Sequence, residues 1–266
     1  MNDFSVSNRF VNEKTGVHWQ VDPSESSFTR LLEHIQVRTQ FYNGFCKSFN
    51  YFLENRSENN MIIADIGGGV GWTSAIMAKH PRVKKVYLVE PSINRRNSFQ
   101  HICNHMKVDP LKVDAINGSF HDFSIPGKVD AIVMCASLHH CRKDYLADLF
   151  RNIFEFLIEK KGKARVLIAN EHYVNIFFSI RRQLSLLKWL FEGKKPFWTT
   201  TNPRHYHPND FEHWRTKSEL DSIFKKNKFI ANYRLLRADL CDDKPLYESL
   251  IMWRYYYATL DYLNIR

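Results

Sequence analysis

One acidic residue and three glycines, spaced every second position, carry the clearest chemical signal in this chain. Asp65, Gly67, Gly69 and Gly71 follow an apolar run at residues 61–66 and precede a stretch of helical composition. Glycines at a strand-to-helix turn let a ligand approach the backbone closely, and the N-terminus of the helix offers unpaired N–H groups. The pattern therefore predicts a loop that binds a nucleotide-like ligand.

Two familiar phosphate-binding patterns do not fit this loop. A dinucleotide fingerprint, Gly-x-Gly-x-x-Gly, would place its third glycine at Trp72 or at Ser74. A P-loop requires a lysine directly before Ser or Thr, and these glycines are not followed by one. The pattern that does fit is Asp-x-Gly-x-Gly-x-Gly.

Further motifs follow three more strand-like runs downstream. Glu90 and Pro91 end the second run, and the third leads to Ser119 and Phe120. The fourth run ends in Cys135, Ala136, Ser137, Leu138, His139 and His140. Ligands of open α/β sheets bind beyond the carboxyl ends of the strands, so these motifs are expected at one common edge.

In this order the motifs resemble those of the class I S-adenosylmethionine-dependent methyltransferases. The resemblance covers roughly residues 60–173, including a turn and fifth strand at residues 161–173. It implies S-adenosyl-L-methionine as the cofactor and S-adenosyl-L-homocysteine as the product. The cofactor-binding residues that it implies are Asp65, Gly67, Gly68, Gly69, Gly71, Trp72, Glu90, Pro91, Ser119, Phe120, Cys135 and Ala136.

The resemblance also implies individual roles. Glu90 stands where the family places an acidic residue on the ribose hydroxyls. Ser119 departs from the family, which often has an Asp there for the adenine amino group, so adenine contacts are expected from the Ser119 hydroxyl, a backbone group or packing of Phe120. Cys135 is interpreted as a small side chain lining the cofactor and not as a nucleophile.

Methyl transfer from a sulfonium is an in-line displacement in which the protein aligns the reacting atoms. A hydroxyl acceptor would benefit from a general base, and histidine suits that role near neutral pH. His139 is the first candidate, with His140 and His172 behind it. A phosphate or carboxylate acceptor would need no base.

Residues expected to contact the acceptor cluster after the fifth strand. A basic amphipathic stretch at residues 174–191 predicts a lid helix in preference to one lying on a membrane surface, and residues 204–215 are rich in His, aromatic and Arg side chains. The predicted acceptor contacts are Glu171, Arg181, Arg204, His205, Tyr206, His207 and Trp214. The histidine spacing matches no defined zinc pattern, so no metal is expected.

Alternating apolar runs and helical stretches predict one doubly wound α/β domain with seven mostly parallel strands, a Rossmann-like methyltransferase fold. The domain would comprise an N-terminal helical cap at residues 1–58, a cofactor-binding core at 59–173, a lid insertion at 174–215 and a C-terminal part at 216–266. Strands are predicted at residues 61–66, 86–89, 113–117, 129–135, 165–170, 229–236 and 250–257. Helices are predicted within residues 26–53 (two) and at 72–79, 92–106, 145–159, 174–191 and 216–226.

The composition of the 266 residues is that of a globular protein, with 44% hydrophobic and 25% charged residues. We find no uninterrupted apolar stretch long enough for a membrane span and no secretory signal at the N-terminus, and the five cysteines are scattered, so a cytoplasmic protein is expected. Residues 151–266 hold 21 of the 38 Lys and Arg but only 13 of the 28 Asp and Glu. This excess of positive charge favours an anionic partner.

The sequence therefore predicts methyl transfer to an oxygen of a small, anionic metabolite or of a sugar or glycan precursor in a biosynthetic pathway. Two alternatives stay open at this point: an RNA methyltransferase, and a protein that binds the cofactor without turnover. No RNA-binding module is recognisable, and Cys135-Ala136-Ser137-Leu138 stands where an Asn-Pro-Pro-Tyr-like motif for base amines would be. The sequence leaves the oligomeric state undecided.

Overall fold

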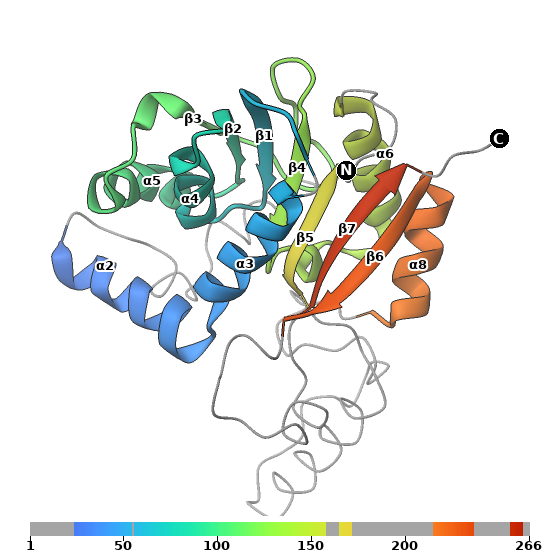
Figure 1. Ribbon diagram of the computed structural model, residues 1–266, viewed down its shortest axis with the longest axis horizontal. Helices are drawn as coiled ribbons and strands as arrows, with labels where there is room; N and C mark the ends of the chain where they lie inside the picture. The colour runs from blue at the N-terminus through green and yellow to red at the C-terminus, as the bar shows by residue number, and fades with distance from the viewer. Residues whose placement is uncertain (1–23, 55, 158–164, 172–214, 237–255, 263–266) are drawn as a thin grey trace, which may run out of the picture.

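A computed structural model describes residues 24–54, 56–157, 165–171, 215–236 and 256–262 of the chain. These residues form one seven-stranded sheet in the order β3-β2-β1-β4-β5-β7-β6 (Figure 1). β7 pairs antiparallel with both of its neighbours, and the other pairs are parallel. The strands are β1 Met61–Ile66, β2 Val83–Val89, β3 Val113–Ile116, β4 Ala131–Cys135, β5 Val166–Glu171, β6 Phe229–Leu235 and β7 Tyr256–Tyr262.

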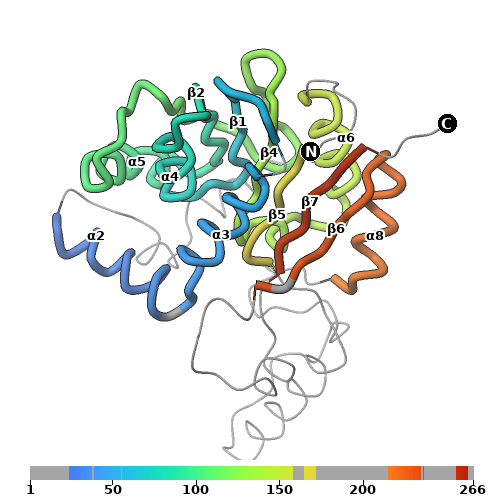
Figure 2. Tube along the Cα trace, viewed as in Figure 1, coloured from blue at the N-terminus to red at the C-terminus, as the bar shows by residue number. Residues whose placement is uncertain are grey.

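Helices cover both faces of the sheet. The colour ramp of Figure 2 follows the chain order, in which α2 and α3 precede β1, and α4, α5, α6 and α8 each lie between two successive strands. One apolar cluster joins the sheet to α2, α3, α4 and α5, and a second joins it to α6 and α8. The helices are α2 Glu25–Leu32, α3 Phe41–Glu54, α4 Trp72–Lys79, α5 Ile93–Met106, α6 Lys143–Phe156 and α8 Lys217–Lys226. A π-helical segment, Glu33–Arg38, joins α2 to α3, and Pro110–Lys112 and Leu138–His140 are single 3-10 turns.

Short polar side chains begin three of these helices. The hydroxyl of Ser24 accepts a hydrogen bond from the Ser27 amide at the start of α2, and Ser92 caps α5 in the same way. Thr216 and Glu219 form a reciprocal capping box at the start of α8. These caps satisfy amide groups that have no partner inside the helix.

Most predicted elements are confirmed, and β1 and α4 have the predicted bounds. Two strands were placed incorrectly: β2 begins three residues earlier, at Val83, and β7 occupies Tyr256–Tyr262 although the prediction ended at residue 257. β7 is buried on both faces over most of its length, so no alternation of polar and apolar residues marked its ends. The predicted helix at residues 174–191 lies outside the described residues, and the division of the chain into cap, core, lid and C-terminal part stays a prediction.

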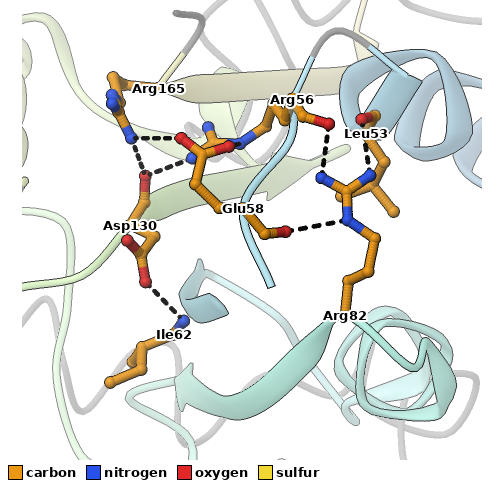
Figure 3. A network of polar contacts seen from close by, with 7 residues as sticks. All are labelled: Leu53, Arg56, Glu58, Ile62, Arg82, Asp130 and Arg165. Carbon is orange, nitrogen blue, oxygen red and sulfur yellow. Dashed lines mark hydrogen bonds and ion pairs between the residues drawn. The ribbon is translucent and has the colours of Figure 1, made fainter. Parts of the chain in front are cut away.

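Buried charged groups hold the amino-terminal edge of the sheet together (Figure 3). The carbonyl of Asp130, just before β4, accepts hydrogen bonds from Arg56 Nη2 at 3.1 Å and from Arg165 Nη1 at 3.2 Å. Glu58 lies between the two guanidinium groups, with Oε2 3.5 Å from Arg56 Nε and Oε1 3.7 Å from Arg165 Nη1. The Asp130 carboxylate accepts the Ile62 amide at 2.9 Å, which ties β1 to the start of β4.

Arg82, directly before β2, extends this network to the end of α3. Its guanidinium donates to the carbonyls of Leu53, Arg56 and Glu58 at 3.0, 2.6 and 2.9 Å (Figure 3). The end of α3 and the segment that leads into β1 are thereby fixed by a side chain that directly precedes β2.

Within the described residues, no helix is long and apolar enough to cross a membrane.

Candidate active site

The glycine loop joins the end of β1 to the start of α4. The amides of Gly67 and Gly68 donate to the carbonyl of Val89 at the end of β2, at 2.8 and 3.3 Å. Gly71 has a φ of 85°, and a Cβ there would lie 2.3 Å from Cδ2 of Phe99, so only glycine fits. Gly69 has a φ of 60°, but a Cβ there would meet nothing within 4 Å. Gly69 therefore lines open space, whereas Gly71 is packed against α5.

Asp65 lies beneath this loop and is completely buried. Its Oδ2 accepts hydrogen bonds from the hydroxyls of Thr73, at 2.6 Å, and Ser74, at 2.7 Å, in the first turn of α4. Its Oδ1 is also buried but has no hydrogen-bond partner among the described residues. Burial raises the pKa of the Asp65 carboxyl to about 6, although the two hydroxyls oppose the rise. Oδ1 of Asp65 is thus a buried acceptor that can receive a hydrogen bond from a ligand.

Glu90, directly after β2, connects that strand to the glycine loop. Its Oε2 accepts the Gly69 amide at 3.1 Å, and its Oε1 accepts the Ser92 amide at 3.0 Å. Burial raises the pKa of Glu90, and Arg95, whose Nη1 is 3.6 Å from Oε1, acts against that rise. The neighbouring carbonyl of Pro91 accepts from Arg96. The predicted ribose-binding carboxylate therefore lies within one hydrogen bond of Gly69.

The segment after β3 contains an acidic residue that the sequence analysis missed. The amide and the hydroxyl of Ser119 both donate to Oδ1 of Asp122, at 2.8 and 2.5 Å. Burial alone would raise the pKa of Asp122, but the hydrogen bonds from Ser119 lower it below its ordinary value. The ring of Phe120 approaches Gly67, since a Cβ on that glycine would lie 3.3 Å from Phe120 Cζ. A Ser–Asp pair thus stands near the position where the family often has a single Asp.

β4 ends beside the glycine loop. The hydroxyl of Ser137 donates to the carbonyl of Ile66 at 2.9 Å, which joins the turn after β4 to the end of β1. Ala136 adopts a left-handed conformation with a φ of 49°, and backbone strain of this kind concentrates at functional sites. Burial raises the pKa of the Cys135 thiol well above its ordinary value, which agrees with its interpretation as an uncharged lining residue.

Trp72, predicted to contact the cofactor, packs its ring against α3. Phe45 meets it edge-on with 5.6 Å between ring centroids, and Tyr42 stacks on it at 6.3 Å. α3 also reaches the end of β5, because the Asn170 side-chain amide donates to the carbonyl of Phe41 at 2.7 Å. The first turns of α3 therefore connect the glycine loop with the last residues of β5.

His139 and Glu171 form a hydrogen-bonded pair at the same edge of the sheet. Nδ1 of His139 lies 2.9 Å from Glu171 Oε2, and Oε1 accepts the amide of Leu138 at 2.6 Å. Glu171 is only 2% exposed, and the His139 side chain is 12% exposed. The ring of His140 lies 4.1 Å from that of His139, centroid to centroid. An imidazole held by a buried carboxylate through one nitrogen can accept a proton at the other.

The structure brings together the predicted residues from β1, β2, β4 and β5. Glu171 bonds to His139, and its predicted contact with the acceptor stays a prediction. His172, Arg181, Arg204, His205, Tyr206, His207 and Trp214 lie outside the described residues, so their roles stay predictions. Among the residues that the structure describes, no group of three or more His, Cys, Asp or Glu side chains is arranged to hold a metal ion.

A family model described as a methyltransferase domain matches residues 63–160. Those residues include the glycine loop, Glu90, Ser119 and the turn that carries His139. The chain is also 28% identical over 153 residues to protein arginine N-methyltransferase 2 of Mus musculus. The match covers 55% of this chain but only 30% of that relative, so the chain spans less than a third of the curated protein that it matches.

Solved structures resemble the whole sheet. Magnesium protoporphyrin IX methyltransferase (ChlM) of Synechocystis PCC 6803, determined with bound SAH, has a TM-score of 0.59 at 10% identity, and 97% of this chain and 99% of that chain are covered. The mitomycin 7-O-methyltransferase MmcR has a TM-score of 0.57 at 12% identity, covering 96% of this chain and 60% of its own. At such low identity the likeness establishes the fold alone.

Proposed function

We propose that this chain is a class I S-adenosylmethionine-dependent methyltransferase, as the methyltransferase-domain match at residues 63–160 supports, and that it methylates an oxygen of a small molecule. His139 serves as the general base in this proposal. The observation that carries it is the hydrogen bond between His139 and the buried Glu171 at the edge of the sheet that holds the glycine loop.

The residues at the glycine loop suit the cofactor. The partnerless Oδ1 of Asp65 is a buried acceptor that an ammonium group of the methionine part would satisfy. Gly69 lines open space and can admit a ligand close to the backbone. The two carboxylate oxygens of Glu90 can accept hydrogen bonds from hydroxyl groups of a ligand. Such a bond to Oε2 would compete with the existing hydrogen bond from the Gly69 amide.

When bound, S-adenosylmethionine supplies a methyl group activated by a sulfonium. The protein then has two tasks, to align the acceptor with that methyl group and to remove the acceptor's proton. A carboxylate can only accept hydrogen bonds, so an ionised Glu171 requires the proton of a neutral His139 to be on Nδ1. Nε2 is then the basic nitrogen, and it would be able to take the proton of a hydroxyl acceptor.

Among oxygen acceptors, a protic oxygen is favoured over an ionised one because only the protic oxygen needs this pair. Phosphate and carboxylate oxygens are already ionised at neutral pH and gain nothing from a base. We further propose that the acceptor carries a negative charge elsewhere in the molecule. The excess of Lys and Arg in residues 151–266, including Arg181 and Arg204, supports this anionic character.

The direct test measures methyl transfer to a series of phenols and alcohols of increasing acidity, with the wild type and His139→Gln. For the least acidic acceptors, loss of the base should lower kcat by about 100-fold or more. The loss should shrink as the acceptor's own pKa falls towards the assay pH. His101→Gln, on α5, is the matched control and should retain full activity.

An equal effect of His139→Gln on all acceptors would contradict the role of general base. Transfer to amines but to no hydroxyl compound would contradict the oxygen acceptor. The anionic preference has its own test, because joint neutralisation of Arg181, Arg182 and Arg204 should raise the acceptor's KM, and unchanged kinetics would refute it.

A further inference from the structure

A third charged residue lies behind His139 and Glu171. Arg215 precedes the cap of α8 and is only 6% exposed. Its Nη1 donates to the carbonyl of Leu138 at 3.5 Å, and its Nη2 donates to the carbonyl of Cys141. Both carbonyls belong to the turn that carries His139. Arg215, which is distant in the sequence, therefore binds the backbone on both sides of the candidate base.

Glu171 holds the same turn from the other direction. The amide of Leu138 donates to its Oε1, and the imidazole of His139 bonds to its Oε2. The turn 138–141 is thus fixed through its N–H by a carboxylate and through its carbonyls by a guanidinium. The position of the imidazole depends on both groups.

The charges of the two groups also complement each other. Arg215 and Glu171 are close enough to interact electrostatically, and Cys141, Glu219 and Tyr256 also act on Arg215. A buried carboxylate beside an imidazole favours the imidazolium form, and a neighbouring cation weakens that preference.

We propose that Arg215 is a positioning residue for methyl transfer: through Glu171 and the turn 138–141, it keeps His139 neutral, protonated on Nδ1 and able to accept a proton at Nε2. This inference rests on the proposed function of His139. It adds a third member that neither the sequence motifs nor the fold assigns.

The test titrates the histidines of the ligand-free protein by two-bond ¹H–¹⁵N NMR, with His139 assigned from the spectrum of His139→Gln. In the wild type, the neutral form of His139 should carry its proton on Nδ1. Arg215→Met should raise the pKa of His139 by about one unit or more, which means about tenfold more imidazolium at a given pH above it. Arg142→Met is the matched control, because Arg142 is exposed, pairs with Asp144 and lies next to the same turn. It should leave the titration unchanged.

An Arg215→Met protein that is folded by circular dichroism but whose His139 titrates as in the wild type would overturn the proposal. So would an equal shift in Arg142→Met. If Arg215→Met does not fold, Arg215→Lys decides, because lysine keeps the charge but lacks the fork that reaches two carbonyls. The Nδ1-protonated form should then lose its dominance, and a spectrum identical to that of the wild type would refute the proposal.

Activity supplies a second readout once an acceptor is known. The acidic limb of the kcat profile should move to higher pH by the same amount as the pKa of His139, with KM for the acceptor unchanged. The NMR titration uses neither cofactor nor acceptor. Failure to methylate any hydroxyl compound would therefore refute the proposed function, whereas an unchanged His139 titration would refute the role of Arg215.

Discussion

The amino-terminal and carboxyl-terminal edges of the sheet differ in how their buried polar groups are paired. At the amino-terminal edge, the carbonyl of Asp130 accepts from two guanidinium groups, and Arg82 donates to three further carbonyls (Figure 3). At the carboxyl edge, Oδ1 of Asp65 and Oδ1 of Asn170 are buried and make no hydrogen bond within the described residues, whereas Arg56 Nε and Glu58 Oε2 of the amino edge, which also make none, form an ion pair at 3.5 Å. Ala136 and Asn170 there have left-handed φ values of 49° and 53°.

This difference separates stability from function within one fold. Unpartnered acceptors and left-handed residues cost folding free energy, and they persist where the surrounding structure enforces them. The hydrogen bonds and ion pairs described for the ionic network all lie at the other edge and include no residue of the candidate active site. Substitutions at the amino edge should therefore act on unfolding, and those at the carboxyl edge on ligand binding.

The largest effect is expected at Arg165, whose side chain is fully buried in the amino-edge network. Arg165→Met would leave Glu58 and the Asp130 carbonyl without this partner, and breaking a buried ionic network costs about 3–5 kcal/mol. Chemical denaturation monitored by circular dichroism measures the loss. Arg151→Met, at an exposed pair with Asp148, should cost less than about 1 kcal/mol. Equal unfolding midpoints for the two variants would remove the distinction between the edges.

Two glycines of the same loop give the next contrast. Gly71→Ala must accept a left-handed alanine and a contact of 2.3 Å with Phe99, so we expect a loss of about 3 kcal/mol in stability. Gly69→Ala should lose only about 1 kcal/mol of stability, the cost of an alanine in the left-handed conformation, because its Cβ would meet only open space. Since that space is where the cofactor is expected, Gly69→Ala should weaken S-adenosylhomocysteine binding by about tenfold. Calorimetry measures the affinity for S-adenosylhomocysteine, and denaturation measures the stability of each variant. Unchanged affinity in folded Gly69→Ala would mean that the ligand does not bind beside Gly69.

The sequence predicted the parts of the site that depend on local spacing. β1 and α4 were located to the residue because Gly67 ends the apolar run and Pro81 follows the helix. Arg215 could not be predicted, because its contacts with the turn 138–141 join residues more than 70 positions apart.

Two further misses have the same cause. Asp122 was missed because its importance comes from the loop conformation that directs Ser119 towards it. The ends of β7 depend on pairing with β5 and β6, and nothing in the local pattern records that pairing. In each case a tertiary contact, invisible to spacing and periodicity, determines the outcome.

Asp65→Asn probes the partnerless acceptor directly. The pKa of the folded Asp65, about 6, lies above the value of about 3.9 expected in the unfolded chain. The folded state therefore binds more protons between about pH 4 and 6, and stability falls as the pH rises through that window. In Asp65→Asn this part of the pH dependence should disappear. Cofactor affinity should drop by about 10- to 100-fold, because a charge-assisted hydrogen bond is lost.

Urea denaturation across pH 4–7 and calorimetric titration measure the two effects of Asp65→Asn separately. Thr73→Val, which removes one hydroxyl from Oδ2 but leaves Oδ1 in place, is the comparison variant. If Asp65→Asn and the wild type show the same pH dependence of stability, the fall in stability within that pH window must come from another carboxyl group. Undiminished affinity would mean that the ligand does not use Oδ1.

The smallest effect is expected at Asp122, on the exposed rim of the carboxyl edge. Because Asp122 accepts the hydroxyl proton of Ser119, the Ser119 oxygen has two lone pairs, one facing His121 Nδ1 at 2.9 Å and one left for a donor such as the adenine amino group. Its lowered pKa keeps the carboxyl ionised at neutral pH, and the stability linked to that shift is lost only as the pH falls through the folded value. Asp122→Asn should weaken S-adenosylhomocysteine binding by about fivefold, the worth of one exposed hydrogen bond.

The analogue that carries oxygen in place of the adenine amino group makes this prediction specific. Wild type should bind that analogue more weakly than S-adenosylhomocysteine, and Asp122→Asn should bind the two with more nearly equal affinity. Asp114→Asn, an exposed aspartate in β3 paired with Lys85, should behave as the wild type. If Asp122→Asn discriminates between the ligands as well as Asp114→Asn does, the Ser119–Asp122 pair only shapes its own loop. Towards β3, the functional part of the carboxyl edge would then end at Glu90, because no acceptor in the segment after β3 would contribute to recognition of the adenine base.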